Sequence, residues 1–165
     1  MNNLFFKLIL CFVFNLFSAC SYDEAESEPD NHQWFQYQYS NEEYELLTII
    51  NNYRKEIGKV EFQVIDYLSI TANQHNAEMI KRDQVGHFGF EERVKKIKSK
   101  LNPAQISENI AYNYLSSYGA FHAWMQSENH RSKIEGNFTH VGISISKNPK
   151  NGRLYYTQIF ILKEG

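Results

Sequence analysis

Cysteine is scarce in this chain, and its scarcity limits both the covalent framework and the chemistry of any folded domain. The 165 residues contain 2 cysteines, Cys11 and Cys20, and both precede the long part of the chain that has the composition of a globular domain. A disulfide framework is therefore excluded for that part, even in a compartment that would allow one. A cysteine nucleophile is excluded there for the same reason.

An excess of charge of one sign is also absent. The chain carries 17 Lys and Arg against 19 Asp and Glu, which gives a net charge of −2. Nucleic-acid-binding proteins need a basic surface that neutralises phosphates, and neither such an excess nor a DNA- or RNA-binding motif occurs here. We therefore expect no nucleic-acid partner. The 42% of apolar residues is enough for a core, and the length suits one domain.

One N-terminal stretch, residues 4–19, is almost wholly apolar. It is shorter than the roughly 20 residues of a membrane-spanning helix and is typical of the apolar region of a signal peptide. The stretch leads into Leu16-Phe17-Ser18-Ala19-Cys20, which resembles the lipobox of bacterial lipoproteins, although that pattern usually has Leu in place of Phe17. We predict a signal peptide over residues 1–19 and an acylated Cys20. A signal peptide cut elsewhere and an uncleaved anchor are the alternatives.

Residues 20–40 are mostly acidic and polar, which predicts a solvated tether between the membrane and the domain. Acidic residues just after such a cysteine also resemble a surface-export signal of bacterial lipoproteins. We therefore expect an extracytoplasmic protein, lipid-anchored to a bacterial membrane (the outer one) or the cell surface. The tether also contains aromatic residues that could dock on the domain, namely Trp34, Phe35, Tyr37 and Tyr39.

The spacing of apolar residues after the tether predicts helices first and a hairpin last. The first predicted helix begins at Ser40 or Asn41 and ends near Gly58. Three further helices are predicted over residues 64–84, 91–101 and 118–125. Residues 106–112 fit a short strand or a turn. Alternation predicts strands over residues 139–146 and 154–162, joined by a hairpin loop. This order favours an α+β fold over a repeated βαβ unit.

Polar clusters recur in a fixed order between these apolar stretches. The clusters are Gly86-His87-Phe88, Ser107-Glu108-Asn109-Ile110, Trp124 to Arg131, and Val141-Gly142-Ile143. Imidazole and carboxylate groups are costly to bury singly but useful when they converge on one site. We therefore predict that His87, Glu108 and His130 share one polar cleft.

In this order and spacing, the motifs resemble the bacterial branch of the CAP superfamily, which groups cysteine-rich secretory proteins, antigen 5 and pathogenesis-related 1 proteins (the SCP domain). The stretch Tyr156-Thr157-Gln158-Ile159-Phe160 extends the resemblance, which covers residues 41–162. It implies a CAP domain over residues 41–165, folded as a three-layer α-β-α sandwich with a central antiparallel sheet. It also implies a large cleft that holds two histidines and two acidic residues.

The resemblance assigns three members of that cleft. His87 matches the first histidine, Glu108 the acid of the Glu-Asn-Ile motif, and His130 the second histidine. The position of the second acid holds Ser127, and Glu128 follows one residue later. One residue turns a helical side chain by about 100°, so Glu128 can point away from the cleft and leave the set of four incomplete.

Two imidazoles and a carboxylate are compatible with three kinds of site. His87, Glu108 and His130 could hold a divalent metal such as Zn²⁺. Alternatively, His130 could act as a base, with Glu108 as orienter or acid and with Ser127 or a water as nucleophile. Finally, the groups could only bind a ligand or tie helices to the sheet. Neither a His-Glu-x-x-His helix nor a Gly-x-Ser-x-Gly elbow occurs in the sequence.

For the other polar residues, structural roles are predicted or weighed against contact with a ligand. Asn109 is expected to satisfy backbone groups beside Glu108. Ser127 and His130 are expected to share a helix face. Arg131 could clamp an anionic ligand or pair with Glu128 or Glu135. His75 is expected in the core, and the basic run of residues 93–100 is expected on a solvated helix face, with an anionic lipid or glycan surface as the alternative.

We therefore expect a monomeric extracytoplasmic CAP-domain protein whose cleft binds a ligand without an assigned turnover. The ligand would be a lipid, a glycan or peptide fragment of the cell wall, or a divalent metal. The alternative is a metal- or His-dependent hydrolase of peptide or glycan. A structural or host-interaction protein with an incidental cleft is a third possibility.

Overall fold

The computed structural model describes residues 36–163. The predicted signal peptide, the acylation site at Cys20 and most of the predicted tether lie outside these residues. Within the described part of the chain, no helix has both the length and the apolar character needed to cross a membrane.

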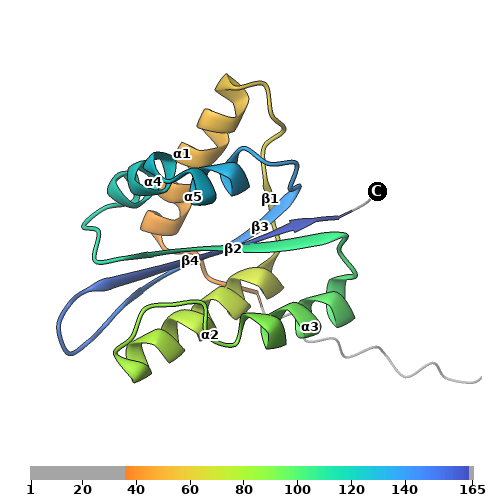
Figure 1. The fold of residues 1–165 in the computed structure, drawn as a ribbon. Coiled ribbons are helices and arrows are strands. Elements are labelled where there is room, and N and C mark those ends of the chain that lie inside the picture. The colour runs from red at the N-terminus through yellow and green to blue at the C-terminus, as the bar shows by residue number, and fades with distance from the viewer. Residues whose placement is uncertain (1–35, 164–165) are drawn as a thin grey trace, which may run out of the picture. The chain divides into compact units, whose positions relative to one another are not determined.

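A four-stranded sheet lies between two groups of helices (Figure 1). Its strands are β1 (Gln63–Val64), β2 (Gln105–Tyr112), β3 (His140–Lys147) and β4 (Leu154–Leu162), in the order β1-β3-β4-β2. Strand β4 pairs antiparallel with both β2 and β3, whereas β1 pairs parallel with β3. The α+β fold with a central, mainly antiparallel sheet is confirmed. The short parallel strand β1 was not predicted, because two residues are too few to show the alternation of apolar and polar residues that is typical of a strand.

The helices divide between the two faces of the sheet (Figure 1). One face is covered by α1 (Asn41–Glu56), α4 (Ser117–Gln126) and α5 (Glu128–Ile134), and the other by α2 (Asp66–Arg82) and α3 (Phe90–Leu101). On the first face, Trp124 and Ile134 pack with Tyr156 and Phe160 of β4. On the second, Leu68 and Ile97 pack with Ile159 and Ile161 of the same strand. Side chains of β4 therefore alternate between the two apolar cores, one on each face of the sheet.

Helix α2 lies very close to β3, and Gly142 makes that approach possible. A β-carbon on Gly142 would lie 2.3 Å from the backbone carbon of Leu68 and 2.4 Å from the amide nitrogen of Ser69. The next residue, Ile143, donates its amide to Ser69 Oγ over 3.0 Å. The glycine of the Val-Gly-Ile motif is therefore needed for packing the helix on the sheet.

Helix α1 begins where the sequence predicts. Ser40 Oγ accepts the Glu43 amide over 3.2 Å, and the Glu43 carboxylate accepts the Ser40 amide over 2.8 Å. This reciprocal pair satisfies two amides that the first turn of a helix leaves without partners.

The aromatic end of the predicted tether packs on the domain. The Tyr37 hydroxyl donates to Glu43 over 2.7 Å, and the Tyr39 hydroxyl shares a hydrogen bond of 2.8 Å with Ser69 Oγ. Docking is therefore confirmed for Tyr37 and Tyr39, and the packed region begins before residue 41. Trp34 and Phe35 lie outside the described residues.

Three helix boundaries differ from the prediction. Helix α2 begins at Asp66, since Val64 belongs to β1, and it ends at Arg82 because Asp83 adopts the left-handed conformation with φ of 50°. The third difference is a break after α4. Ser127 is extended, with φ of −105° and ψ of 115°, and separates α4 from the short helix α5, which the apolar pattern did not predict.

Candidate functional site

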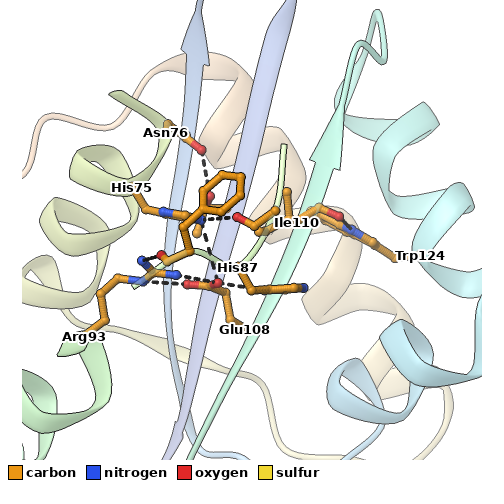
Figure 2. Close-up of polar contacts among 10 residues, drawn as sticks. His75, Asn76, His87, Arg93, Glu108, Ile110 and Trp124 are labelled. Carbon is orange, nitrogen blue, oxygen red and sulfur yellow. Dashed lines mark hydrogen bonds and ion pairs between the residues drawn. The ribbon is translucent and has the colours of Figure 1, made fainter. Parts of the chain in front are cut away.

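The site is built around Glu108, a carboxylate in the middle of β2 that is only 3% exposed. It lies on the face of the sheet that α2 and α3 cover (Figure 2). Arg93, from the first turn of α3, holds it with two hydrogen bonds (Figure 2): Nε donates to Oε2 over 2.9 Å and Nη2 donates to Oε1 over 2.7 Å. A buried carboxylate requires such a partner, because desolvation of an unpaired charge costs several kcal/mol.

Arg93 corrects the interpretation of the basic run. The lysines at positions 95, 96, 98 and 100 are exposed, as predicted, but Arg93 is partly buried and reaches inward to Glu108. The signal was present in the sequence: Arg93 precedes Ile97 by four residues, and Ile97 is buried in the core. Residues four apart share a helix face, so Arg93 belongs to the inward face of α3.

His87 is the second partner of Glu108. Its Nδ1 lies 2.8 Å from Glu108 Oε1, and its side chain is 50% exposed against 2% for Glu108. Because a carboxylate only accepts hydrogen bonds, Nδ1 carries a proton, and Nε2 is the ring nitrogen left for another partner. Within residues 36–163, no group forms a hydrogen bond with that Nε2. The geometry therefore leaves an oriented, half-exposed imidazole.

His75 lies behind this pair. It is buried, as predicted, and its Nε2 donates to the Gly86 carbonyl over 3.0 Å while lying 3.8 Å from Glu108 Oε1. Its Nδ1 is buried without a partner among the described residues. Burial lowers the pKa of His75, and this outweighs the opposing effect of the Glu108 charge. His75 is therefore a neutral ring beside the site, a placement that its apolar neighbours on α2 did not reveal.

His130 approaches the site from the other face of the sheet, on α5. Asn109 Nδ2 donates to the His130 carbonyl over 3.1 Å, which ties α5 to β2 beside Glu108 and confirms the expected role of Asn109. Burial lowers the pKa of His130, and the charges of Lys133 and His87 lower it further. Among the described hydrogen bonds, it is the backbone of His130 that is tied to β2.

The hydrolase alternative has Glu108 orient His130, but the described hydrogen bonds give Glu108 other partners. Among the hydrogen bonds of the described residues, Glu108 contacts His87 and Arg93, and none joins it to the His130 ring. The reason is that His87, in the loop that follows α2, lies over the same face of the sheet as Glu108, whereas α5 packs on the opposite face. An orienting carboxylate is present, but it orients His87.

The remaining residues of the Trp124–Arg131 motif do not form a catalytic pair. Ser127 and His130 do not share a helix face, because Ser127 is the extended residue that precedes α5. Arg131 Nη1 donates to the Met125 carbonyl over 2.9 Å, and its Nε lies 3.9 Å from Glu135. Of the two interpretations of Arg131, the structure therefore supports pairing with Glu135 and not a clamp for an anionic ligand. Glu128 is exposed on the first turn of α5.

The arrangement does not fit a metal ion. In the part of the chain that the structure describes, no three His, Cys, Asp or Glu side chains gather closely enough to hold one. Both Glu108 oxygens are also occupied by the guanidinium of Arg93. The predicted set of His87, Glu108 and His130 for Zn²⁺ thus has no geometric support in the described residues.

The sequence and the fold were compared with those of known proteins. A family model described as CAP, the cysteine-rich secretory protein family, matches residues 47–160. The uncharacterized membrane protein YlbC of Bacillus subtilis (strain 168) is 27% identical over 135 residues, which cover 78% of this chain and 36% of YlbC. This chain therefore spans well under half of that relative's length.

Solved structures share the fold at low identity. An outer surface protein from Borrelia burgdorferi has a TM-score of 0.69 and 16% identity, covering 78% of this chain and 98% of its own. An extracellular protein containing an SCP domain from Bacillus anthracis str. Ames has a TM-score of 0.64 and 21% identity, covering 74% of this chain and 40% of its own. A cysteine-rich secretory protein from Staphylococcus aureus subsp. aureus Mu50 has a TM-score of 0.64 and 20% identity, covering 74% and 38% respectively.

Proposed function

Because this chain belongs to the cysteine-rich secretory protein (CAP) family, we propose that it is an extracytoplasmic module that binds a ligand through His87 and His130. The observation that carries the proposal is the hydrogen bond of 2.8 Å from His87 to the buried Glu108, with half of the His87 side chain left exposed. A buried ion pair that orients a solvent-facing imidazole is costly to build. That cost is reasonable if the imidazole has a ligand to meet.

Binding without turnover fits these residues better than hydrolysis. Both oxygens of Glu108 accept hydrogen bonds from Arg93, and one also from His87, so Glu108 is already engaged by protein groups and is not free to act on a substrate. Ser127 forms no side-chain hydrogen bond with either histidine among the described residues. A hydrolase remains the second candidate, because a carboxylate that orients an imidazole is also the arrangement of a general base acting on water. In that case the base would be His87.

The test is a binding screen with matched variants. Soluble cell-wall fragments and lipids would be tested on the wild type, His87→Ala and His122→Ala, where His122 is an exposed histidine of α4. We expect a ligand whose binding is lost in His87→Ala and retained in His122→Ala. Glu108 keeps Arg93 in the first variant, so the fold should survive. Equal binding by all three proteins would contradict the proposal, and products formed only by proteins that retain His87 would favour the hydrolase.

We also propose that the domain is carried outside the cytoplasm on a lipid at Cys20. The support is the sequence of residues 1–20, which resembles a lipoprotein signal. The names of similar proteins point the same way, since they describe an outer surface protein, an extracellular protein and a membrane protein.

A further inference from the structure

The loop that carries His87 is held by side chains and not by the backbone ladder of a helix or a strand. Among the described residues, no backbone–backbone hydrogen bond involves Gly86 or Phe88, the two neighbours of His87. Their carbonyl groups accept hydrogen bonds from side chains instead. His75 Nε2 donates to the Gly86 carbonyl over 3.0 Å, and Arg93 Nη1 donates to the Phe88 carbonyl over 2.6 Å. The backbone is therefore fixed immediately before and immediately after His87.

Both donors belong to the interior of the domain. His75, on α2, is 2% exposed, and the side chain of Arg93, on α3, is 11% exposed (Figure 2). Nε and Nη2 of Arg93 donate to Glu108, the carboxylate that orients the His87 ring. The ring and the backbone of His87 are therefore held by one connected set of buried groups, although half of the His87 side chain is exposed.

The histidine at position 75 has a cost that an apolar residue would not have. It lies in a row of fully buried apolar residues of α2, which comprises Leu68, Ala72 and Met79. The Nδ1 of His75 is buried without a hydrogen-bond partner among the described residues, which costs free energy. The bond to Gly86 is the one hydrogen bond that the His75 side chain makes in the described part of the chain. What a histidine adds over an apolar residue is therefore the fixed Gly86 carbonyl.

We propose that His75 is a positioning residue of the binding site: through the Gly86 carbonyl it holds the loop, so that the His87 ring is in place before a ligand arrives. The inference rests on the proposed function, in which His87 meets the ligand. A loop that is already ordered loses less conformational entropy on binding, so it binds more tightly than a mobile loop with the same contacts. His75 therefore contributes to affinity from a buried position.

The first test is NMR of the full chain with isotope-labelled nitrogen. In the wild type, His75 Nε2 should carry a proton that exchanges slowly with water, and the amides of Gly86, His87 and Phe88 should be as rigid as those of α2. In His75→Leu these amides should become mobile on the picosecond-to-nanosecond timescale, because the Gly86 carbonyl loses its donor. His75→Gln should stay close to the wild type, since its side-chain amide supplies a donor. His122→Leu makes the same change at an exposed histidine of α4 and should leave the loop unchanged.

Three results would overturn the role of His75. A wild-type His75 ring that is protonated at Nδ1 and not at Nε2 could not donate to the Gly86 carbonyl, and this observation needs no variant. A loop that stays as rigid in His75→Leu as in the wild type would show that the bond is not needed. Equal mobility in His75→Leu and His75→Gln would trace the loss to the missing ring and not to the missing donor.

The second test measures affinity and separates this inference from the proposed function. A cell-wall fragment or lipid that binds the wild type but not His87→Ala should bind His75→Leu roughly three- to tenfold more weakly, the effect expected of one neutral hydrogen bond. His75→Gln should bind it nearly as tightly as the wild type. Equal binding by His75→Leu and the wild type would overturn this inference and leave the proposed function in place. If no fragment or lipid binds through His87, the proposed function fails, and the NMR measurements alone decide whether His75 fixes the loop.

Discussion

At the scale of single residues, Glu108 decides which basic groups remain available to a ligand. Its two oxygens accept hydrogen bonds from Arg93 and His87. The guanidinium of Arg93 is therefore not available to a ligand, and the imidazole of His87 is oriented. His75, 3.8 Å from the same carboxylate, is buried, and this burial lowers its pKa. Chemically similar side chains within one cluster therefore have different roles, which follow from burial and not from residue type.

The buried His75 predicts a pH dependence of stability. Burial lowers the pKa of His75 below its usual value of 6.5, so the unfolded chain takes up a proton more readily than the folded one. This effect is absent well above pH 6.5 and destabilises the fold increasingly as the pH falls below it. We predict that His75→Gln loses less unfolding free energy than the wild type between about pH 7.5 and 5.5, measured by urea denaturation. The same loss in both proteins would contradict this assignment, since His130 and His140 are present in both.

At the scale of elements, the position of α2 on the sheet depends on close backbone contact as well as on side-chain packing. Gly142 allows Leu68 and Ser69 to touch β3, and the Ser69 hydroxyl then accepts the Ile143 amide. The loop that carries His87 follows α2 directly. The helix-to-sheet distance therefore also sets the position of His87 relative to Glu108.

Gly142→Ala should consequently destabilise the domain strongly. The added methyl group would lie 2.3 Å from the Leu68 backbone, and overpacking of this kind typically costs about 1–3 kcal/mol, or more where backbone must move. Gly119→Ala in α4 is the matched control, because its new methyl group would lie 3.4 Å from Ser116 Oγ and alanine favours a helix. We expect a clear loss of unfolding free energy for the first variant and none for the second, in the same denaturation assay. Equal values for both would show that α2 can move away at little cost.

At the scale of the whole molecule, the site is assembled from segments on both faces of the sheet. The loop after α2 and the first turn of α3 reach Glu108 from one face, and α5 reaches the neighbouring Asn109 from the other (Figure 1). The ends of the described chain do not contribute to it.

Cys20→Ser tests the anchor. Without the thiol no thioether or acyl link can form, so the protein should move from the membrane fraction to the soluble fraction of cells that express it. Cys11→Ser should keep the protein in membranes, since the predicted signal peptide is removed together with that residue. Fractionation and immunoblotting of both variants would measure this. Membrane retention of Cys20→Ser would refute acylation at that position.

Much of the fold was accessible from the sequence because its signals are local. The helices α1, α3 and α4 and the strands β3 and β4 agree with apolar spacing to within a few residues, and the cap at Ser40 was recognised from its chemistry. The boundary after α2 and the break at Ser127 were missed. Both depend on the conformation of a single residue, which apolar spacing does not encode.

The sequence by itself determined the order of the longer helices and strands, the family, and the identity of His87 and Glu108 as residues of a polar site. Only the tertiary structure decided that Glu108 pairs with His87 and Arg93. The physical reason is that ion pairing depends on distances of a few ångströms between segments far apart along the chain. Periodicity tells which face of an element is buried, but not which group from another element it meets there.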